Sequence, residues 1–76
     1  MGTLYFKRSN GEKILVKERV AEGEVYKAIT DAVTKMNPNY KIYYMRSWTS
    51  TEDYSVTVYD VGSHTEFFLY EKTSSN

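Results

Sequence analysis

Apolar and polar residues alternate near the start of the chain, with a period of two that is typical of a half-buried β-strand. This pattern predicts strands over residues 3–8 and 12–20, joined by a three-residue loop with Gly11 at its left-handed position. The loop sets Phe6 opposite Ile14 and Leu4 opposite Val16. The face expected to meet the core carries Leu4, Phe6, Ile14 and Val16. The opposite face is expected to carry Tyr5, Lys7, Lys13, Leu15, Lys17 and Arg19.

The pattern then changes to a helical period. Apolar residues recur on one stripe from residue 22 to residue 36 or 37: Val25, Ile29, Ala32 or Val33, and Met36. Ala21 occupies the position where a capping Ser or Asp would be expected, so the predicted helix lacks a good side-chain N-cap. Pro38 cannot continue a helix and therefore ends it.

A third strand is predicted over residues 40–48, followed by a polar loop over residues 49–53. The facing of this strand is ambiguous. One alternative turns Tyr43, Met45 and Ser47 toward the helix, and the other turns Ile42, Tyr44, Arg46 and Trp48 toward it. Burying an unpaired arginine costs free energy, so we expect Arg46 to point away from the helix, together with Tyr44 and Trp48.

Residues 54–70 form a second predicted hairpin, with Gly62-Ser63 as a two-residue type II′ turn. In that register Tyr59 faces Glu66. Because side chains alternate along a strand, two sets lie on opposite faces. The set expected to meet the helix consists of Val56, Val58, Phe67 and Leu69. The set expected on the uncovered side consists of Tyr59, Val61, His64, Phe68 and Tyr70.

These elements predict an α+β fold of order ββαβββ, in which a single antiparallel five-stranded sheet has one helix packed on one face. Residues 1–72 are expected to form one domain, and residues 73–76 a frayed tail. The side of the sheet without a helix would then hold a cluster of large side chains with basic ones among them: Tyr5, Leu15, Tyr44, Trp48, Tyr59, Phe68 and Tyr70, with Lys7, Lys17 and Arg46.

Soluble monomers seldom expose a large contiguous apolar patch, so the uncovered side is predicted to bind a protein partner. The expected contact residues are Tyr5, Tyr44, Arg46, Trp48, Tyr59, Phe68 and Tyr70. Self-association into a homodimer would bury the same side. Alternatively, the long basic side chains drape over the rings and nothing binds there.

Composition narrows the classes of function. Ten basic and ten acidic residues give a net charge of zero, which argues against a strongly electrostatic nucleic-acid binder. Single-stranded nucleic acid stacking on the exposed rings remains a second hypothesis, and a small ligand or nucleotide held between associated copies is a third. The charges are distributed unevenly, because residues 1–46 carry nine bases and five acids, whereas residues 47–76 carry one base and five acids.

No catalytic, cofactor or metal site is predicted, so the chain is not expected to be an enzyme. Asp60, Ser63 and His64 are residue types found in hydrolases, but the predicted register puts Asp60 and His64 on opposite faces beside a tight turn. The paired acids Glu52 and Asp53 indicate a solvated loop rather than a metal site. The chain has no cysteine and a single histidine, which excludes disulfides, thiolate metal sites and multi-histidine sites.

The apolar runs suggest no contact with a membrane. None approaches the roughly 20 residues that span a bilayer. Lys7 and Arg8 interrupt the first apolar residues, so no signal-peptide pattern is present. A cytoplasmic protein is the expectation that follows.

Two segments carry a resemblance to a known group of proteins. They are Tyr43-Tyr44-Met45-Arg46-Ser47-Trp48 and Asp60-Val61-Gly62-Ser63-His64-Thr65-Glu66-Phe67-Phe68. With these segments the whole chain resembles small uncharacterised proteins encoded by phages and prophages of Gram-positive bacteria. The resemblance implies a phage accessory protein in the bacterial cytoplasm that binds and inhibits a host factor, such as a defence nuclease. It implies no site residues.

Overall fold

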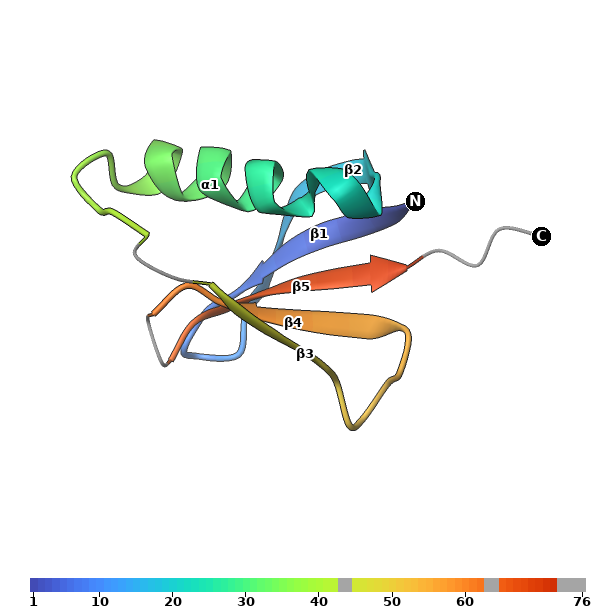
Figure 1. Ribbon diagram of the computed structural model, residues 1–76. Helices are drawn as coiled ribbons and strands as arrows, with labels where there is room; N and C mark the ends of the chain where they lie inside the picture. Colours follow the sequence, from blue (N-terminus) through green and yellow to red (C-terminus); the bar gives the residue numbers. More distant parts are fainter. Residues whose placement is uncertain (43–44, 63–64, 73–76) are drawn as a thin grey trace.

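The described residues of the chain fold into five strands and one α-helix (Figure 1). The computed structural model describes residues 1–42, 45–62 and 65–72. Its elements are β1 (Gly2–Lys7), β2 (Lys13–Val20), the 3-10 turn η1 (Glu22–Glu24), α1 (Val25–Met36), β3 (Arg46–Thr49), β4 (Val56–Asp60) and β5 (Phe67–Lys72). The strands form a single sheet of order β2-β1-β5-β4-β3 in which all neighbours are antiparallel. The predicted α+β fold, with α1 on one side of this sheet, is confirmed (Figure 1).

The β1–β2 hairpin has the predicted register next to its loop, where Phe6 pairs with Ile14 and Tyr5 pairs with Leu15. Beyond that point the register shifts, and Leu4 pairs with Lys17. A bulge of one residue reverses which face the following side chains occupy. Lys17 therefore lines a hollow beside helix residue Ala28, and its predicted position on the uncovered side is wrong.

A second register shift follows before Gly2 pairs with Val20, and Arg19 has a left-handed backbone with φ of +56°. Successive bulges bend a strand and increase its twist. The end of β2 accordingly rises beside α1 (Figure 1), and the side chain of Val20 is buried in the core. This bend gives the helix a short connection from β2 through η1.

The helix ends where the sequence predicts, but α1 begins at Val25, three residues after the predicted start, because Glu22–Glu24 form the 3-10 turn η1. Ala21 provides no side-chain cap, and its N–H instead donates to the Glu24 carboxylate at 3.4 Å. The buried side chains of α1 form one stripe: Val25, Ala28, Ile29 and Val33. Met36 was expected on this stripe, but its side chain is half exposed because α1 ends one residue before Asn37 and two before Pro38.

The β4–β5 hairpin differs from its predicted register by two residues, because Tyr59 pairs with Phe68 instead of Glu66. A displacement of two residues keeps each set of side chains together on one face. The face that meets the helix, however, is the other one. Its members are buried in the core with Leu4 and the α1 stripe: Tyr59, Val61, Phe68 and Tyr70. The predicted orientation of this hairpin is therefore wrong, and Val56, Val58, Phe67 and Leu69 lie on the side without a helix.

Packing around Tyr70 explains why the rings lie under α1. Gly2 has no side chain, and a Cβ atom there would lie 2.8 Å from the Tyr70 ring, so glycine leaves the space that the ring fills. The Tyr70 hydroxyl donates to the Val20 carbonyl at 2.6 Å, which satisfies its polar end inside the core. Rings fill the space between helix and sheet that shorter aliphatic side chains would leave empty.

The third strand is shorter than predicted. It covers only Arg46–Thr49, whereas the prediction began at Tyr40. The preceding Tyr40, Ile42 and Met45 pack against the core without forming a regular strand, which explains why neither predicted alternation describes them. Arg46 and Trp48 point away from α1 as predicted, whereas Tyr43, Tyr44, Ser63, His64 and residues 73–76 lie outside the described residues.

Candidate protein-binding face

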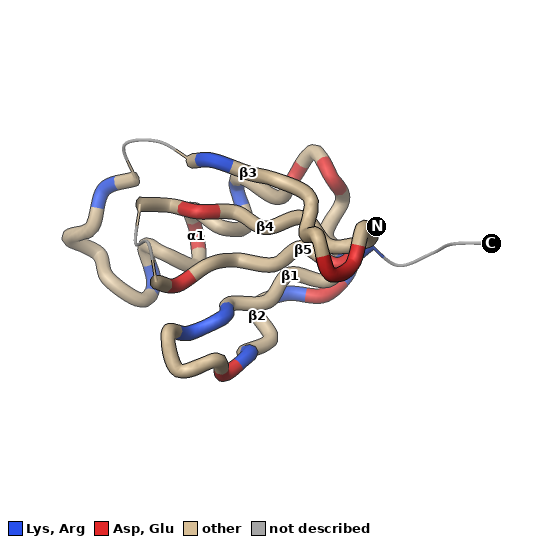
Figure 2. The backbone as a smooth tube through the Cα atoms, turned by 90° about the horizontal axis from the view of Figure 1, so that it is seen from below, with Lys and Arg blue, Asp and Glu red and all other residues tan. Residues whose placement is uncertain are grey.

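The side of the sheet opposite α1, here called the open face, presents its five strands side by side without a covering helix (Figure 2). Strand register places one apolar side chain from each strand in a single line across this face. This apolar row consists of Leu15, Tyr5, Leu69, Val58 and Trp48, in the spatial order of the strands. Because the row crosses the whole sheet, the open face has a continuous apolar centre.

Side chains next to the apolar row enlarge it. The Phe67 ring meets the Trp48 ring edge to face, with ring centroids 6.0 Å apart. These two rings, with Val56 and Leu69, line an open hollow of about 390 Å³. Leu15 is 53% exposed and Trp48 is 42% exposed, so both ends of the row remain available for contact.

Basic side chains cover only part of this surface. The ammonium group of Lys13 lies over the Tyr5 ring, 4.2 Å from its centroid, and forms an ion pair with Glu71. Lys13 therefore shields Tyr5 in the way that draping basic side chains were expected to do. It leaves Leu15 and Trp48 exposed at the two ends of the row.

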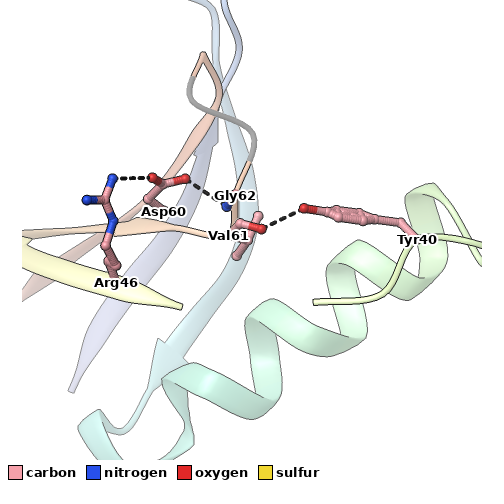
Figure 3. Close-up of polar contacts among 5 residues, drawn as sticks. All are labelled: Tyr40, Arg46, Asp60, Val61 and Gly62. Atoms are coloured by element: carbon pink, nitrogen blue, oxygen red, sulfur yellow. Dashed lines mark hydrogen bonds and ion pairs between the residues drawn. The ribbon is translucent and has the colours of Figure 1, made fainter. Parts of the chain in front are cut away.

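Arg46 and Asp60 anchor β3 to β4 at one end of the open face (Figure 3). The Asp60 side chain is 1% exposed and accepts a hydrogen bond from the Arg46 guanidinium at 2.9 Å and one from the Gly62 N–H at 2.8 Å. The Tyr40 hydroxyl donates to the Val61 carbonyl at 2.6 Å, which ties the segment before β3 to the same turn. Asp60 thus has a structural role as the buried acceptor that joins Arg46 to the backbone of Gly62.

Five ionisable groups of the described residues have pKa values shifted away from neutral pH. Burial raises the pKa of Tyr59 and Tyr70. The hydrogen bond and ion pair with Lys72 lower the pKa of Glu22, and the same contact raises the pKa of Lys72. Hydrogen bonds from Ser55 lower the pKa of Asp53. None of these groups is adjusted to exchange protons near pH 7, as a general acid or base would be.

The expected contact residues divide into three groups. Tyr5, Arg46 and Trp48 lie on the open face. Tyr59, Phe68 and Tyr70 are buried under α1, so their predicted exposure is wrong. Tyr44 lies outside the described residues.

The open face also carries residues that the sequence assigned to the core: Val56, Val58, Phe67 and Leu69. Periodicity identified them as one set but carried no signal for the side they occupy. The side that they occupy depends on a contact between distant parts of the chain: Gly2 has no side chain, so the Tyr70 ring can pack against it under α1.

The fold and this face define a small α+β protein with one uncovered, apolar sheet face. Within the described residues there is no cluster of three or more His, Cys, Asp or Glu side chains that could hold a metal ion. No helix in the described part of the chain has the length and apolar character needed to cross a membrane. No known protein-family model, curated protein or solved structure matches this chain.

Proposed function

We propose that this chain is a non-enzymatic interaction protein that binds another protein surface through its open face. The observation that supports this function is the apolar row, which crosses all five strands with no helix above it. Leaving such a row in water is unfavourable, and contact with a complementary apolar surface removes it from water.

Trp48 is the side chain on which we expect binding to depend most. It is large, partly exposed and held edge to face by Phe67. Tryptophan is enriched among residues that dominate interface energies, because a rigid ring buries much area at little entropic cost. Arg46, fixed by Asp60, lies 5.9 Å from the centroid of the Trp48 ring and supplies a polar contact beside it.

The resemblance to phage and prophage proteins suggests where such a partner would be found. It implies a phage accessory protein in the bacterial cytoplasm whose partner is a host factor, for example a defence nuclease. The open face supports the binding part of this proposal, and the identity of the host factor rests on the resemblance alone.

Protein binding is better supported than binding of single-stranded nucleic acid. A stacking platform requires several exposed rings with basic neighbours. Three of the expected rings are buried, namely those of Tyr59, Phe68 and Tyr70. Lys17, which was expected among the basic residues beside these rings, lies on the helix side.

The experiment compares two substitutions at equally exposed apolar residues on opposite sides of the sheet. Leu15 is 53% exposed at one end of the apolar row, and Met36 is 54% exposed at the end of α1. Tagged wild type, Leu15→Lys and Met36→Lys are incubated with lysate of a Gram-positive host, and each captured protein is then purified and titrated against all three. Wild type and Met36→Lys should bind with equal affinity, whereas Leu15→Lys should bind at least about tenfold more weakly.

Two results would count against this function. One is a captured protein that binds Leu15→Lys and Trp48→Ala as tightly as it binds the wild type. The other is captured nucleic acid whose affinity falls steeply with added salt, because that dependence is the signature of phosphate contacts.

A further inference from the structure

Charged side chains on the open face are separated along the strand direction. On one side of the apolar row lie Lys7 on β1 and Lys13 on β2, which occupy directly opposite positions in the register of these two strands. On the other side lie Glu71 on β5 and, in the loop between β3 and β4, Glu52 and Asp53. By strand register the open face therefore has a basic end and an acidic end, and the Lys13–Glu71 ion pair crosses the apolar row between them.

Two of these charges have no ion-pair partner within the described residues: Lys7 at the basic end and Glu52 at the acidic end. Both side chains line the hollow that Trp48 and Phe67 form. The other charges are engaged within the chain, since Lys13 pairs with Glu71 and Asp53 accepts hydrogen bonds from Ser55. An unpaired cation and an unpaired anion thus lie on opposite sides of the same apolar row.

A surface with this arrangement is complementary to itself. Consider a two-fold axis that lies in the plane of the interface and runs along the apolar row, so that the open face of one copy stacks on that of another. The rotation places apolar row on apolar row and the basic end of each copy over the acidic end of the other. In a dimer with two-fold symmetry, each contact between a basic end and an acidic end occurs twice. An axis along the strands would instead bring like-charged ends together.

We propose that the occupant of the open face is a second copy of this chain, stacked face to face about a two-fold axis along the apolar row. This inference rests on the proposed function, because it assigns a partner to the same face. The pairing joins Lys7 of each copy to the acidic end of its partner. It also covers Leu15 and Trp48, the two ends of the row that Lys13 leaves exposed.

The first test is the mass in solution, measured by sedimentation equilibrium at micromolar concentration. Wild type and Met36→Lys should sediment at twice the monomer mass of 8.9 kDa, and Leu15→Lys at the monomer mass. Circular dichroism of each variant checks that it is folded. A wild type that sediments as a monomer overturns self-association but leaves binding to a foreign protein in place. A dimer that Leu15→Lys does not weaken also overturns self-association through the open face, because the contact then lies elsewhere, whereas the proposed function is tested by the affinity of a captured protein.

The second test addresses the orientation of the two copies. An axis along the apolar row keeps each strand over the same strand of the other copy, so Lys7 on β1 faces Glu71 on the neighbouring β5 of its partner. Lys7→Glu and Glu71→Lys should each weaken the dimer about tenfold, because two exposed attractive contacts become repulsive. An equimolar mixture of the two variants should recover the wild-type affinity, since both contacts between residues 7 and 71 in a mixed pair again join a carboxylate to an ammonium group. Recovery in the mixture supports the proposed axis. A mixture as weak as its components overturns it.

The third test uses the absence of native cysteine, which makes an introduced thiol unique. An axis along the apolar row places each residue of the row opposite its own counterpart, so Leu15→Cys in one copy faces Leu15→Cys in the other. Stacked sheets are about 10 Å apart, so a short bismaleimide should link these thiols where a disulfide could not. Met36→Cys should give no cross-linked dimer. An axis along the strands would bring residue 15 over Trp48, and cross-linking at Leu15→Cys would then fail.

Discussion

The covered and the open face of the sheet both carry large apolar side chains, but of different kinds. Under α1 lie Tyr59, Phe68 and Tyr70, whose rings extend into the core. The open face carries the aliphatic Val58 and Leu69 at its centre. Tyrosine is the more polar residue, yet it is the buried one. The difference shows that shape and hydrogen-bond partners decide which side is buried here, and that hydrophobicity alone does not.

Phe67 and Phe68 are consecutive residues of the same type that lie on opposite faces of the sheet. Phe68 is completely buried and packs on Phe6 with ring centroids 5.0 Å apart, whereas Phe67 is partly exposed on the open face beside Trp48. Phe68→Ala should lower the free energy of unfolding by about 3–5 kcal/mol, because it leaves a cavity in the core. Phe67→Ala should cost about 1 kcal/mol, since the ring already contacts water. Urea unfolding measures both, and equal losses would contradict the assignment of the two faces.

Gly2 provides the next largest expected effect. A Cβ atom at this position would lie 2.6 Å from the Glu71 carbonyl oxygen and 2.8 Å from the Tyr70 ring. Gly2→Ala should therefore destabilise the protein by about 1–3 kcal/mol through overpacking. Gly23→Ala is the control, because a Cβ atom there meets nothing within 4 Å and should leave stability within about 0.5 kcal/mol. If thermal unfolding is equally affected by both, Tyr70 does not require the space at Gly2.

The smallest effect concerns the hydroxyl of Tyr70. Tyr70→Phe removes the hydrogen bond to the Val20 carbonyl and should cost about 1–2 kcal/mol. Tyr54→Phe should have no effect, because Tyr54 is the most exposed large apolar side chain of the described residues.

The burial of Tyr70 also predicts that the free energy of unfolding depends on pH. Burial raises the pKa of Tyr70 and Tyr59 above that of an unfolded tyrosine, so the unfolded chain loses these protons first as pH rises. Their contribution to the free energy of unfolding is constant up to about pH 10 and is lost above it. Tyr70→Phe should make the loss above that pH shallower in denaturant titrations. A loss of unchanged slope would show that Tyr70 does not titrate differently in the folded and unfolded chains.

The two hairpins illustrate how far sequence patterns can be followed. The first hairpin has a loop of defined type, in which Gly11 takes the left-handed position. This loop predicts the register beside it, in which Phe6 pairs with Ile14. Bulges are not visible in alternation, so the position of Lys17 was missed. In the second hairpin the predicted register is wrong by two residues, but the same side chains still share each face, because the faces alternate with a period of two. The side of the first hairpin that faces α1 was predicted correctly at Leu4 and Phe6, because its other face carries several lysines. The side of the second hairpin could not be read from the sequence, because a strand with apolar residues on both faces has no local preference between them.

The sequence by itself determined the order and type of the elements, the C-terminal end of the helix and the two sets of side chains on the second hairpin, because these depend on spacing along the chain. Only the tertiary structure decided which set became the core and which became the open face. That choice depends on the space left by Gly2, on the carbonyl that accepts the Tyr70 hydroxyl and on the bend of β2 toward α1. These contacts join residues far apart in the chain, and no local pattern records them.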